Sequence, residues 1–340
     1  MSRDLMVENA AMQVKNVDRL DTDQLSALVA LIEEATQVDG VAPLSEQALL
    51  DAREGPPSWI TTTPAAHFLA YDGRHLAGYA HLEREPAATT ATAQTTERAA
   101  TAELVVDPDY RRHGFGTALV HALEESLGEG TLQFWSHGHI GVARFFAARE
   151  GAANVRALWT MRRPLGPEAR PLPPVQLPQG YAARHFVVGQ DEDAWLRVNA
   201  RAFVHHPEQG QMTRVDLNRR MAQSWFDTTG LILVEDTRGP MPVLAASHWT
   251  KVVPPKDPQA SPTEGEVYVV AVDPAYQGMG LGQTVTVLGL LHLVERGVAE
   301  AFLYVEGDNT RAASIYSELG FTRTGSDVMY SLRVHPPVPR

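Results

Sequence analysis

The sequence predicts an α/β protein built from two similar domains, each with a mixed sheet. The stretch "VDPDYRRHGFGTAL" at 106–119 recurs in altered form as "VDPAYQGMGLGQTV" at 272–285, about half the chain further on. Strand-like and helix-like segments follow each other in the same order around both stretches. Between the halves, residues 162–180 contain six prolines. A duplicated α/β domain explains all three observations.

The elements can be assigned in order around each repeat. Residues 67–83 and 231–249 each predict two short strands around a turn. Residues 143–152 and 312–321 are similar helical segments. In the second half we expect strands at 266–272, 301–306 and 326–332, and helices at 282–296 and 310–319.

The proline-rich stretch sets the expected domain boundaries. Proline removes a backbone donor and favours extended chain, as in linkers. We therefore expect an N-terminal domain at 1–165, a linker at 166–177 and a C-terminal domain at 178–340.

Composition excludes several classes of protein. The net charge of −12 argues against a nucleic-acid or anionic-membrane binder. The absence of cysteine excludes disulfides, thiolate metal sites and cysteine nucleophiles. No apolar run is long enough to span a bilayer and no opening stretch resembles a signal peptide. We expect a cytoplasmic monomer that acts on a small molecule.

The glycines of the second repeat indicate an anion site. Gly278, Gly280 and Gly282 lie between a predicted strand and a predicted helix. The first amides of a helix lack internal partners, and glycine lets a ligand approach them closely. A connecting turn is the alternative. A dinucleotide site would place its first glycine directly after the strand, and a P-loop would need Gly-Lys-Ser/Thr. Coenzyme A is the remaining common ligand.

Two motifs resemble those of the GNAT acetyltransferases. Gln277, Gly280 and Gly282 fill the acyl-CoA loop pattern, which the first half matches less closely at 112–116. The stretch "NTRAASIYSELGF" at 309–321 matches the second signature of that family at every marked position. The resemblance implies two tandem GNAT domains, each a mixed, mostly antiparallel, twisted sheet flanked by helices.

Aligning the repeats separates their roles. Glu266, Asn309 and Tyr316 of the second half have no counterparts of the same type in the first half. The aligned positions there hold alanine or isoleucine. The nearest carboxylate there, Glu103, is three positions away and on the opposite strand face. We therefore expect a catalytic C-terminal domain and a non-catalytic N-terminal domain that retains a place for acetyl-CoA.

The expected chemistry is amine acetylation. An α-amino group has a pKa near ~8, so a base such as Glu266 helps at neutral pH. The family pattern places Tyr316 as the proton donor to the leaving thiolate, and the backbone N–H groups of Val270–Val272 would hold the oxyanion. The structural alternatives are that Glu266 is a solvated carboxylate at the start of a strand and that Tyr316 is a tyrosine of the core.

Over 20–332 the chain also resembles the mycothiol synthase family, for example in "VDGVAPLSEQAL", "LRVNARAFVHHPEQG" and "GEVYVVAVDP". That resemblance implies acetyl transfer from acetyl-CoA to the cysteine amine of cysteinyl-glucosaminyl-inositol. The implied substrate residues are Glu46, Glu208, Lys251, Glu266 and Tyr304. The implied acetyl-CoA residues are Val270, Ala271, Val272, Gln277, Gly278, Met279, Gly280, Leu281, Gly282, Gln283, Asn309, Thr310, Arg311, Ala312, Ala313 and Ser314, with Leu104, Val105, Val106, Arg112, His113, Gly114, Phe115, Gly116 and Thr117 in the first half.

Other readings remain open on the residues alone. Glu46 suits the first turn of a helix, and the segment around Glu208 suits a surface turn. The histidines at 137, 139, 205 and 206 lack the spacing of a metal site, so we expect no metal. A GNAT enzyme for another small amine, and a non-catalytic acyl-CoA sensor, are the rival functions.

Overall fold

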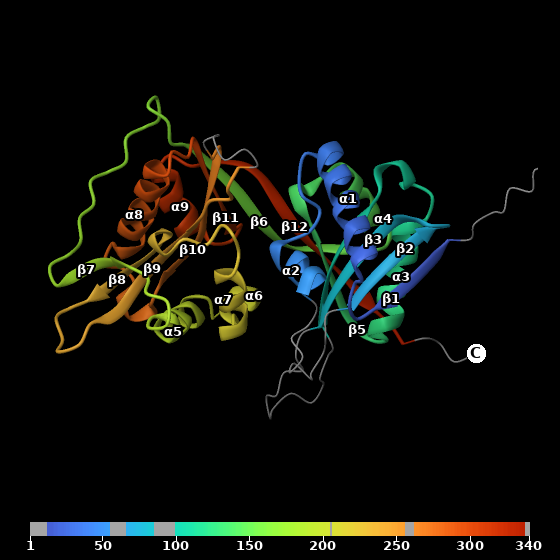
Figure 1. The fold of residues 1–340 in the computed structure, drawn as a ribbon, viewed down its shortest axis with the longest axis horizontal. Coiled ribbons are helices and arrows are strands. Elements are labelled where there is room, and N and C mark those ends of the chain that lie inside the picture. Colours follow the sequence, from blue (N-terminus) through green and yellow to red (C-terminus); the bar gives the residue numbers. More distant parts are fainter. Residues whose placement is uncertain (1–11, 55–65, 85–98, 205, 256–261, 337–340) are drawn as a thin grey trace, which may run out of the picture. The chain divides into compact units, whose positions relative to one another are not determined.

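The protein contains two α/β units, as the sequence predicts. The computed structural model describes residues 12–54, 66–84, 99–204, 206–255 and 262–336 (Figure 1). The first unit comprises residues 1–157 and 326–340, and the second comprises residues 158–325. Each has a mixed sheet covered by helices on both faces.

The first unit has a sheet in the order β1-β2-β3-β4-β5-β12. Its strands are β1 (Gln13–Val17), β2 (Ala66–Asp72), β3 (His75–Arg84), β4 (Ala99–Val106), β5 (Gly130–Ser136) and, from residue 326 onward, β12 (Thr322–Val334). Its helices are α1 (Thr22–Asp39), α2 (Glu46–Glu54), α3 (Phe115–Leu127) and α4 (Gly141–Arg149), with 3-10 turns η1 (Pro108–Tyr110) and η2 (His137–His139). Only β4 and β5 pair in parallel, and the other pairs that we describe in this sheet are antiparallel.

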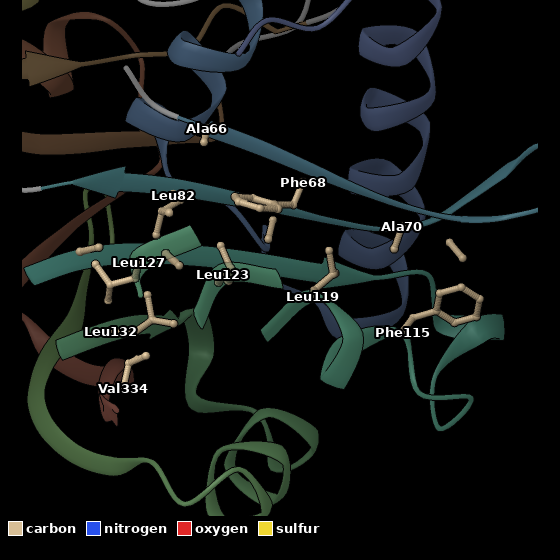
Figure 2. Close-up of a cluster of buried hydrophobic side chains, with 14 residues drawn as sticks. Ala66, Phe68, Ala70, Leu82, Phe115, Leu119, Leu123, Leu127, Leu132 and Val334 are labelled. Carbon is tan, nitrogen blue, oxygen red and sulfur yellow. The ribbon is translucent and has the colours of Figure 1, made fainter. Parts of the chain in front are cut away.

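Helix α3 shows how the sequence produces this packing. Its apolar side chains recur every four residues, so they share one face. Figure 2 shows Phe115, Leu119, Leu123 and Leu127 directed at the sheet, where they are buried with Phe68 among other residues. Helices α1 and α2 cover the opposite face with a separate buried cluster.

The second unit repeats this plan with the order β6-β11-β10-β9-β8-β7. Its strands are β6 (Ala153–Pro164), β7 (Tyr181–His185), β8 (Leu231–Asp236), β9 (Val243–Lys251), β10 (Glu264–Val272) and β11 (Glu300–Glu306). Its helices are α5 (Glu192–Ala202), α6 (Pro207–Gly210), α7 (Arg214–Met221), α8 (Leu281–Glu295) and α9 (Thr310–Glu318), with 3-10 turns η3 (Thr228–Gly230) and η4 (Pro274–Tyr276). Helices α8 and α9 pack on one face, and α5 and α7 on the other (Figure 1).

Each half of the chain gives its last strand to the other sheet. Strand β6 follows the helices of the first half, yet residues 158–164 pair with β11. Strand β12 ends the second half, yet residues 328–334 pair with β5. The division into units therefore differs from the expected boundaries at 165 and 178, because strand exchange depends on distant pairing that no local pattern records.

The expected linker at 166–177 packs on the second unit. This stretch has neither helix nor strand. Leu172 and Val175 nevertheless lie against the apolar cluster beneath α8. The buried Arg163 guanidinium donates to the carbonyls of Leu319 and Arg170, which ties the stretch to the end of α9. A cation at a helix C-terminus is favourable, since the dipole is negative there.

A buried ion network joins three elements of the first unit. His137 Nδ1 lies 3.0 Å from Asp327 of β12, and its Nε2 lies 3.3 Å from Glu103 of β4. Burial alone would lower the pKa of His137, but the two carboxylates outweigh it and raise the pKa to about 10. Burial would likewise raise the pKa of Glu103, but hydrogen bonds from His137 and Ser45 lower it.

The network predicts an alkaline loss of stability. The folded-state pKa of His137 lies above its ordinary value of 6.5, so its stabilisation is complete below pH 6.5 and is lost as pH rises towards 10. His137→Gln should lower the free energy of unfolding by about 3 kcal/mol near neutral pH, because two buried carboxylates lose their cation. Urea unfolding from pH 6 to 10 should show the deficit narrowing, whereas His121→Gln, at an exposed site of α3, should show no such trend. A deficit that stays constant over this range would contradict the assignment.

Candidate active site

The sheet of the second unit opens at one point. Strands β10 and β11 pair in parallel only from Glu264 opposite Glu300 to Glu266 opposite Phe302. Beyond that point β10 continues to Val272, paired with β9 alone. In this part of β10, which includes residues 270–272, the amides that point away from β9 therefore have no strand beside them. They border a gap between β10 and β11. Glu266 stands where the gap begins.

A β-bulge lies just after Glu266. The register between β9 and β10 shifts between Val267 and Val269, so Tyr268 is the extra residue. Val267 packs in the cluster beneath α8, whereas Val269 packs in the cluster beneath α5 and α7. The bulge thus changes which face the later side chains of β10 point to.

Three of the expected substrate residues share one face of this sheet. Lys251 of β9 stands directly opposite Glu266 of β10 in the antiparallel register, so both side chains project to the same side. Ala301, Leu303 and Val305 of β11 are buried beneath α8. Tyr304 alternates with them and therefore points to the opposite face, where its side chain is 47% exposed. The structure brings Lys251, Glu266 and Tyr304 together on the face that carries α5 and α7.

The two remaining substrate residues stand apart from this set. Glu46 is the first residue of α2 in the first unit. Glu208 belongs to α6, and its side chain lies outside the described residues. His206, just before α6, has its Nε2 3.3 Å from the carboxylate of Glu306 at the end of β11. This contact holds the start of α6 near the open end of the gap.

The loop after β10, residues 277–283, has the geometry expected of an anion-binding loop, and we call it the cradle. Gly278 and Gly280 have φ angles of 82° and 79°, in the left-handed region. Gly280 is the N-cap of α8, which no described side chain caps. A Cβ at either glycine would meet no described atom within 4 Å. The free amides at the start of α8 therefore face open space at the positive end of a helix dipole.

Neighbouring groups hold this loop in shape. Asp273 accepts a hydrogen bond of 2.9 Å from the Ala275 amide and lies 3.1 Å from Arg201. Gln277 donates to the Val272 carbonyl at 3.4 Å. Gln277, Gly278, Met279, Gly280 and Gln283 are exposed, whereas Leu281 is buried and offers only its backbone. A Cβ at Gly282 would lie 3.6 Å from Val272, an ordinary van der Waals contact, so the packing of the loop on β10 does not itself require glycine there.

The expected residues at 309–314 form a second helix start. Asn309 is the N-cap of α9, and its side-chain oxygen accepts from the Ala312 amide at 3.1 Å. Thr310, Arg311 and Ser314 are exposed, and Ala313 is buried. Asn309 therefore has a structural role in this motif whether or not it touches a ligand.

Tyr316 lies on the opposite side of the sheet from Glu266. Its ring packs in the cluster beneath α8 and α9, edge-on to Phe321 at a centroid distance of 5.9 Å. Burial raises the pKa of Tyr316 to about 12. The hydroxyl therefore keeps its proton at physiological pH.

The first unit keeps the loop but changes its residues. Gly114 caps α3 at φ 95°, and Arg112 has φ 68° where the second unit has Gly278. Strands β4 and β5 pair only from Ala99 to Ala102, which leaves a similar gap. A cavity of about 520 Å³ lies there. Its lining includes Leu104, Val105, Val106, Arg112, Gly114, Gly116 and Thr117.

Two of the first-half expectations differ from this arrangement. The Phe115 side chain is buried in the core beneath α3, and His113 is exposed; neither lines the cavity. In addition, β4 pairs with β3 without a bulge, so the structural counterpart of Glu266 is Thr101 rather than Ala100. The position still lacks a carboxylate, as the sequence predicts. Glu103, however, lies two residues from Thr101 and so shares its face of the sheet, whereas the sequence alignment places it on the opposite face.

The spacing of the histidine and acidic groups among the described residues limits where a metal ion could bind. Within the described ranges, one group of three oxygen ligands lies close together, namely Glu34, Asp107 and Asp109. Asp107 already accepts from the Asp109 amide and lies 2.6 Å from His75. His137 is held by two carboxylates, and His205 lies outside the described residues.

Comparison with known families fits this geometry. Residues 31–148 and 205–321 each match the family model described as Acetyltransferase (GNAT) family. The chain belongs to the GNAT acetyltransferase family. The two matches fall on the two halves, so the GNAT fold is present twice.

Relatives of this GNAT protein share its length. A mycothiol acetyltransferase of Thermomonospora curvata is 47% identical over 92% of this chain and 95% of its own. Another of Catenulispora acidiphila is 45% identical over 93% and 98%.

Solved structures share the tandem fold. A tandem GNAT protein from the clavulanic acid biosynthesis pathway superposes with a TM-score of 0.68 at 17% identity, over 96% of this chain and 100% of its own. The N-myristoyltransferase of Saccharomyces cerevisiae, solved with bound myristoyl-CoA, has a TM-score of 0.59 at 11% identity, over 95% and 80%. None of the helices described has the length and apolar character needed to cross a membrane.

The repeated loop allows a matched test within the GNAT protein. Gly280→Val should weaken coenzyme A binding and lower turnover by about 10²-fold, because valine strains a left-handed position and fills the cradle. Gly114→Val makes the same change in the first unit and should leave turnover near that of the wild type. Calorimetric titration and steady-state rates measure both effects. Equal losses in two folded variants would contradict the separation of roles.

Proposed function

We propose that this GNAT enzyme acetylates the cysteine amine of cysteinyl-glucosaminyl-inositol, with acetyl-CoA as donor, and so acts as a mycothiol acetyltransferase. The observation that carries the proposal is 47% identity over nearly the whole of both chains to a relative of that name. The grouping of Lys251, Glu266 and Tyr304 on one sheet face agrees with it.

The second unit fits the acyl donor in this proposal. The uncapped start of α8, with two left-handed glycines before open space, suits a pyrophosphate. The gap between β10 and β11 offers backbone donors to the extended arm that follows. Acetyl-CoA would supply the activated acetyl group, and the residues at 277–283 and 309–314 would hold it.

Glu266 and Tyr316 then divide the proton transfers. Glu266 takes a proton from the acceptor ammonium or amine, directly or through water. Tyr316, whose pKa of about 12 keeps it protonated, donates to the departing sulfur. Amides at 270–272 stabilise the negative charge that develops on the carbonyl oxygen. The two side chains lie on opposite faces of the sheet, which keeps the two proposed proton transfers apart.

The acceptor is rich in hydroxyls and carries an ammonium group. Carboxylates form strong charge-assisted hydrogen bonds with both, which suits Glu46, Glu208 and Glu266. Lys251 and Tyr304 supply donors to its oxygens. In the first unit, the 520 Å³ cavity would hold acetyl-CoA without catalysis, because Thr101 stands where Glu266 stands in the second.

The identity of the acceptor is tested by a panel of amines. The purified protein, given acetyl-CoA, should acetylate cysteinyl-glucosaminyl-inositol with a kcat/KM far above that for polyamines and aminoglycosides, as measured by mass spectrometry. Preference for one of the other amines would refute the proposed acceptor and leave the GNAT assignment standing.

Replacement of the base should reduce turnover in a pH-dependent way. Glu266→Gln should lower kcat by about 10²-fold or more at pH 7, since a positioned base contributes 10²–10⁴-fold. The deficit should shrink above the amine pKa of ~8, where the acceptor is already neutral. Glu264→Gln, on the same strand and paired with Arg162, is the control. Wild-type rates for Glu266→Gln at pH 7 would remove Glu266 from the mechanism.

Loss of the proposed acid should affect kcat and not donor binding. Tyr316→Phe keeps the ring against Phe321 but removes the proton, so kcat should fall by about 10²-fold. Because the pKa of Tyr316 is about 12, its removal should not shift any limb of the pH–rate profile between pH 6 and 10. An altered affinity for coenzyme A with unchanged kcat would point to a packing role instead.

A further inference from the structure

The ammonium of Lys251 lies against two aromatic rings of the second unit. Its Nζ is 4.9 Å from the centroid of Trp225 and 5.1 Å from that of Tyr268. The two rings are themselves 5.2 Å apart and inclined at 65°. A cation within about 6 Å of a ring face is attracted to its negative centre, so both rings favour this position of the ammonium.

The Tyr268 ring is fixed in turn by other groups. It occupies the bulge of β10, two residues after Glu266. Its hydroxyl accepts a hydrogen bond of 2.9 Å from Arg220 Nε of α7. Trp249 packs against it edge-on at 5.3 Å. The ring therefore has constraints at its base, its edge and its hydroxyl, which leaves it little freedom to move away from Lys251.

This arrangement places a positive charge beside the proposed base. Lys251 and Glu266 are opposite each other in the β9–β10 register, where Cβ atoms are about 4.5–5.5 Å apart. A lysine side chain has four flexible carbons and much rotamer entropy, so it does not hold one position unaided. The two rings reduce that entropy before the acceptor binds, which is the general benefit of preorganisation.

We propose that Trp225 and Tyr268, with Arg220 behind them, are positioning residues that fix the Lys251 ammonium next to Glu266 for recognition of the acceptor. This inference rests on the proposed function, because it assigns Lys251 to the acceptor. The rings themselves do not touch the reacting atoms. Their contribution is to acceptor binding, so it enters KM for the acceptor and leaves the affinity for coenzyme A unchanged.

A double-mutant cycle between Lys251 and Tyr268 tests the inference. Tyr268→Leu removes the ring and should raise KM for the acceptor by about 3- to 30-fold, the range of a cation–π contact converted at tenfold per 1.4 kcal/mol. Tyr268→Phe keeps the ring and should restore most of the loss. In a Lys251→Met background, Tyr268→Leu should add almost nothing, because the cation that it positions is gone. Additive losses would mean that Tyr268 acts on general packing and would overturn the proposal.

A second variant and a matched control guard against misfolding. Arg220→Gln removes the donor to the Tyr268 hydroxyl without emptying the core, and it should raise KM for the acceptor by a smaller factor than Tyr268→Leu. Arg323→Met removes a contact of the same kind elsewhere in this unit, where Arg323 lies 4.5 Å over Trp159, and it should leave KM unchanged. An unchanged KM in Arg220→Gln, or an effect as large in Arg323→Met, would count against the proposal.

The wild-type reaction separates the two claims. If the wild type does not acetylate cysteinyl-glucosaminyl-inositol, the proposed function fails, and the cycle is run on the amine that the panel identifies. If the wild type acetylates it and the cycle is additive, the positioning inference alone fails. Calorimetric titration with coenzyme A should give the same affinity for every variant, which confirms that the donor site is intact.

Discussion

The parallel pairing of β10 with β11 stops at Glu266, and the position of the candidate site in the second unit depends on this. A sheet that opens in its interior exposes backbone donors without a strand to receive them, and unpaired amides are unfavourable unless another group pairs with them. An extended ligand between the strands can do so. The same opening places the carboxylate of Glu266 at its narrow end and the uncapped start of α8 beyond Val272. In the proposed function, these two places receive the reactive end and the anionic end of the thioester donor.

The first unit treats an equivalent opening differently. Its strands stop pairing after Ala102, and the next residue of β4 is Glu103, whose carboxylate is bound by His137 and Ser45. Ionised side chains of the protein therefore occupy the narrow end of this gap, and Asp327 completes the network. Both units keep the glycine loop at the start of a helix, but the opening of the first unit is occupied by this network of side chains.

Local patterns explain what the sequence could predict. The Asp-Pro turn, the glycines and the start of the next helix are neighbours in the chain, so the sequence predicts where each glycine loop lies between strand and helix. The bulge at Tyr268 and the exchange of β6 and β12 depend on pairing between distant segments, which periodicity does not record. For that reason the sequence alignment places the counterpart of Glu266 one residue away from its structural position, and it gives no sign of the ring contacts of Lys251.

The placement of Glu266 and Tyr316 also constrains how the proposed catalytic cycle would be completed. Glu266 and Tyr316 lie on opposite faces of one sheet, so a proton accepted by one cannot pass directly to the other. Glu266 is half-buried on the face that carries α5 and α7, whereas the Tyr316 ring packs in the apolar cluster beneath α8 and α9. The pKa of Tyr316 is about 12, so its hydroxyl recovers a proton readily once it has donated one. In the proposed cycle each group therefore returns to its starting state on its own face of the sheet, without direct proton transfer between Glu266 and Tyr316.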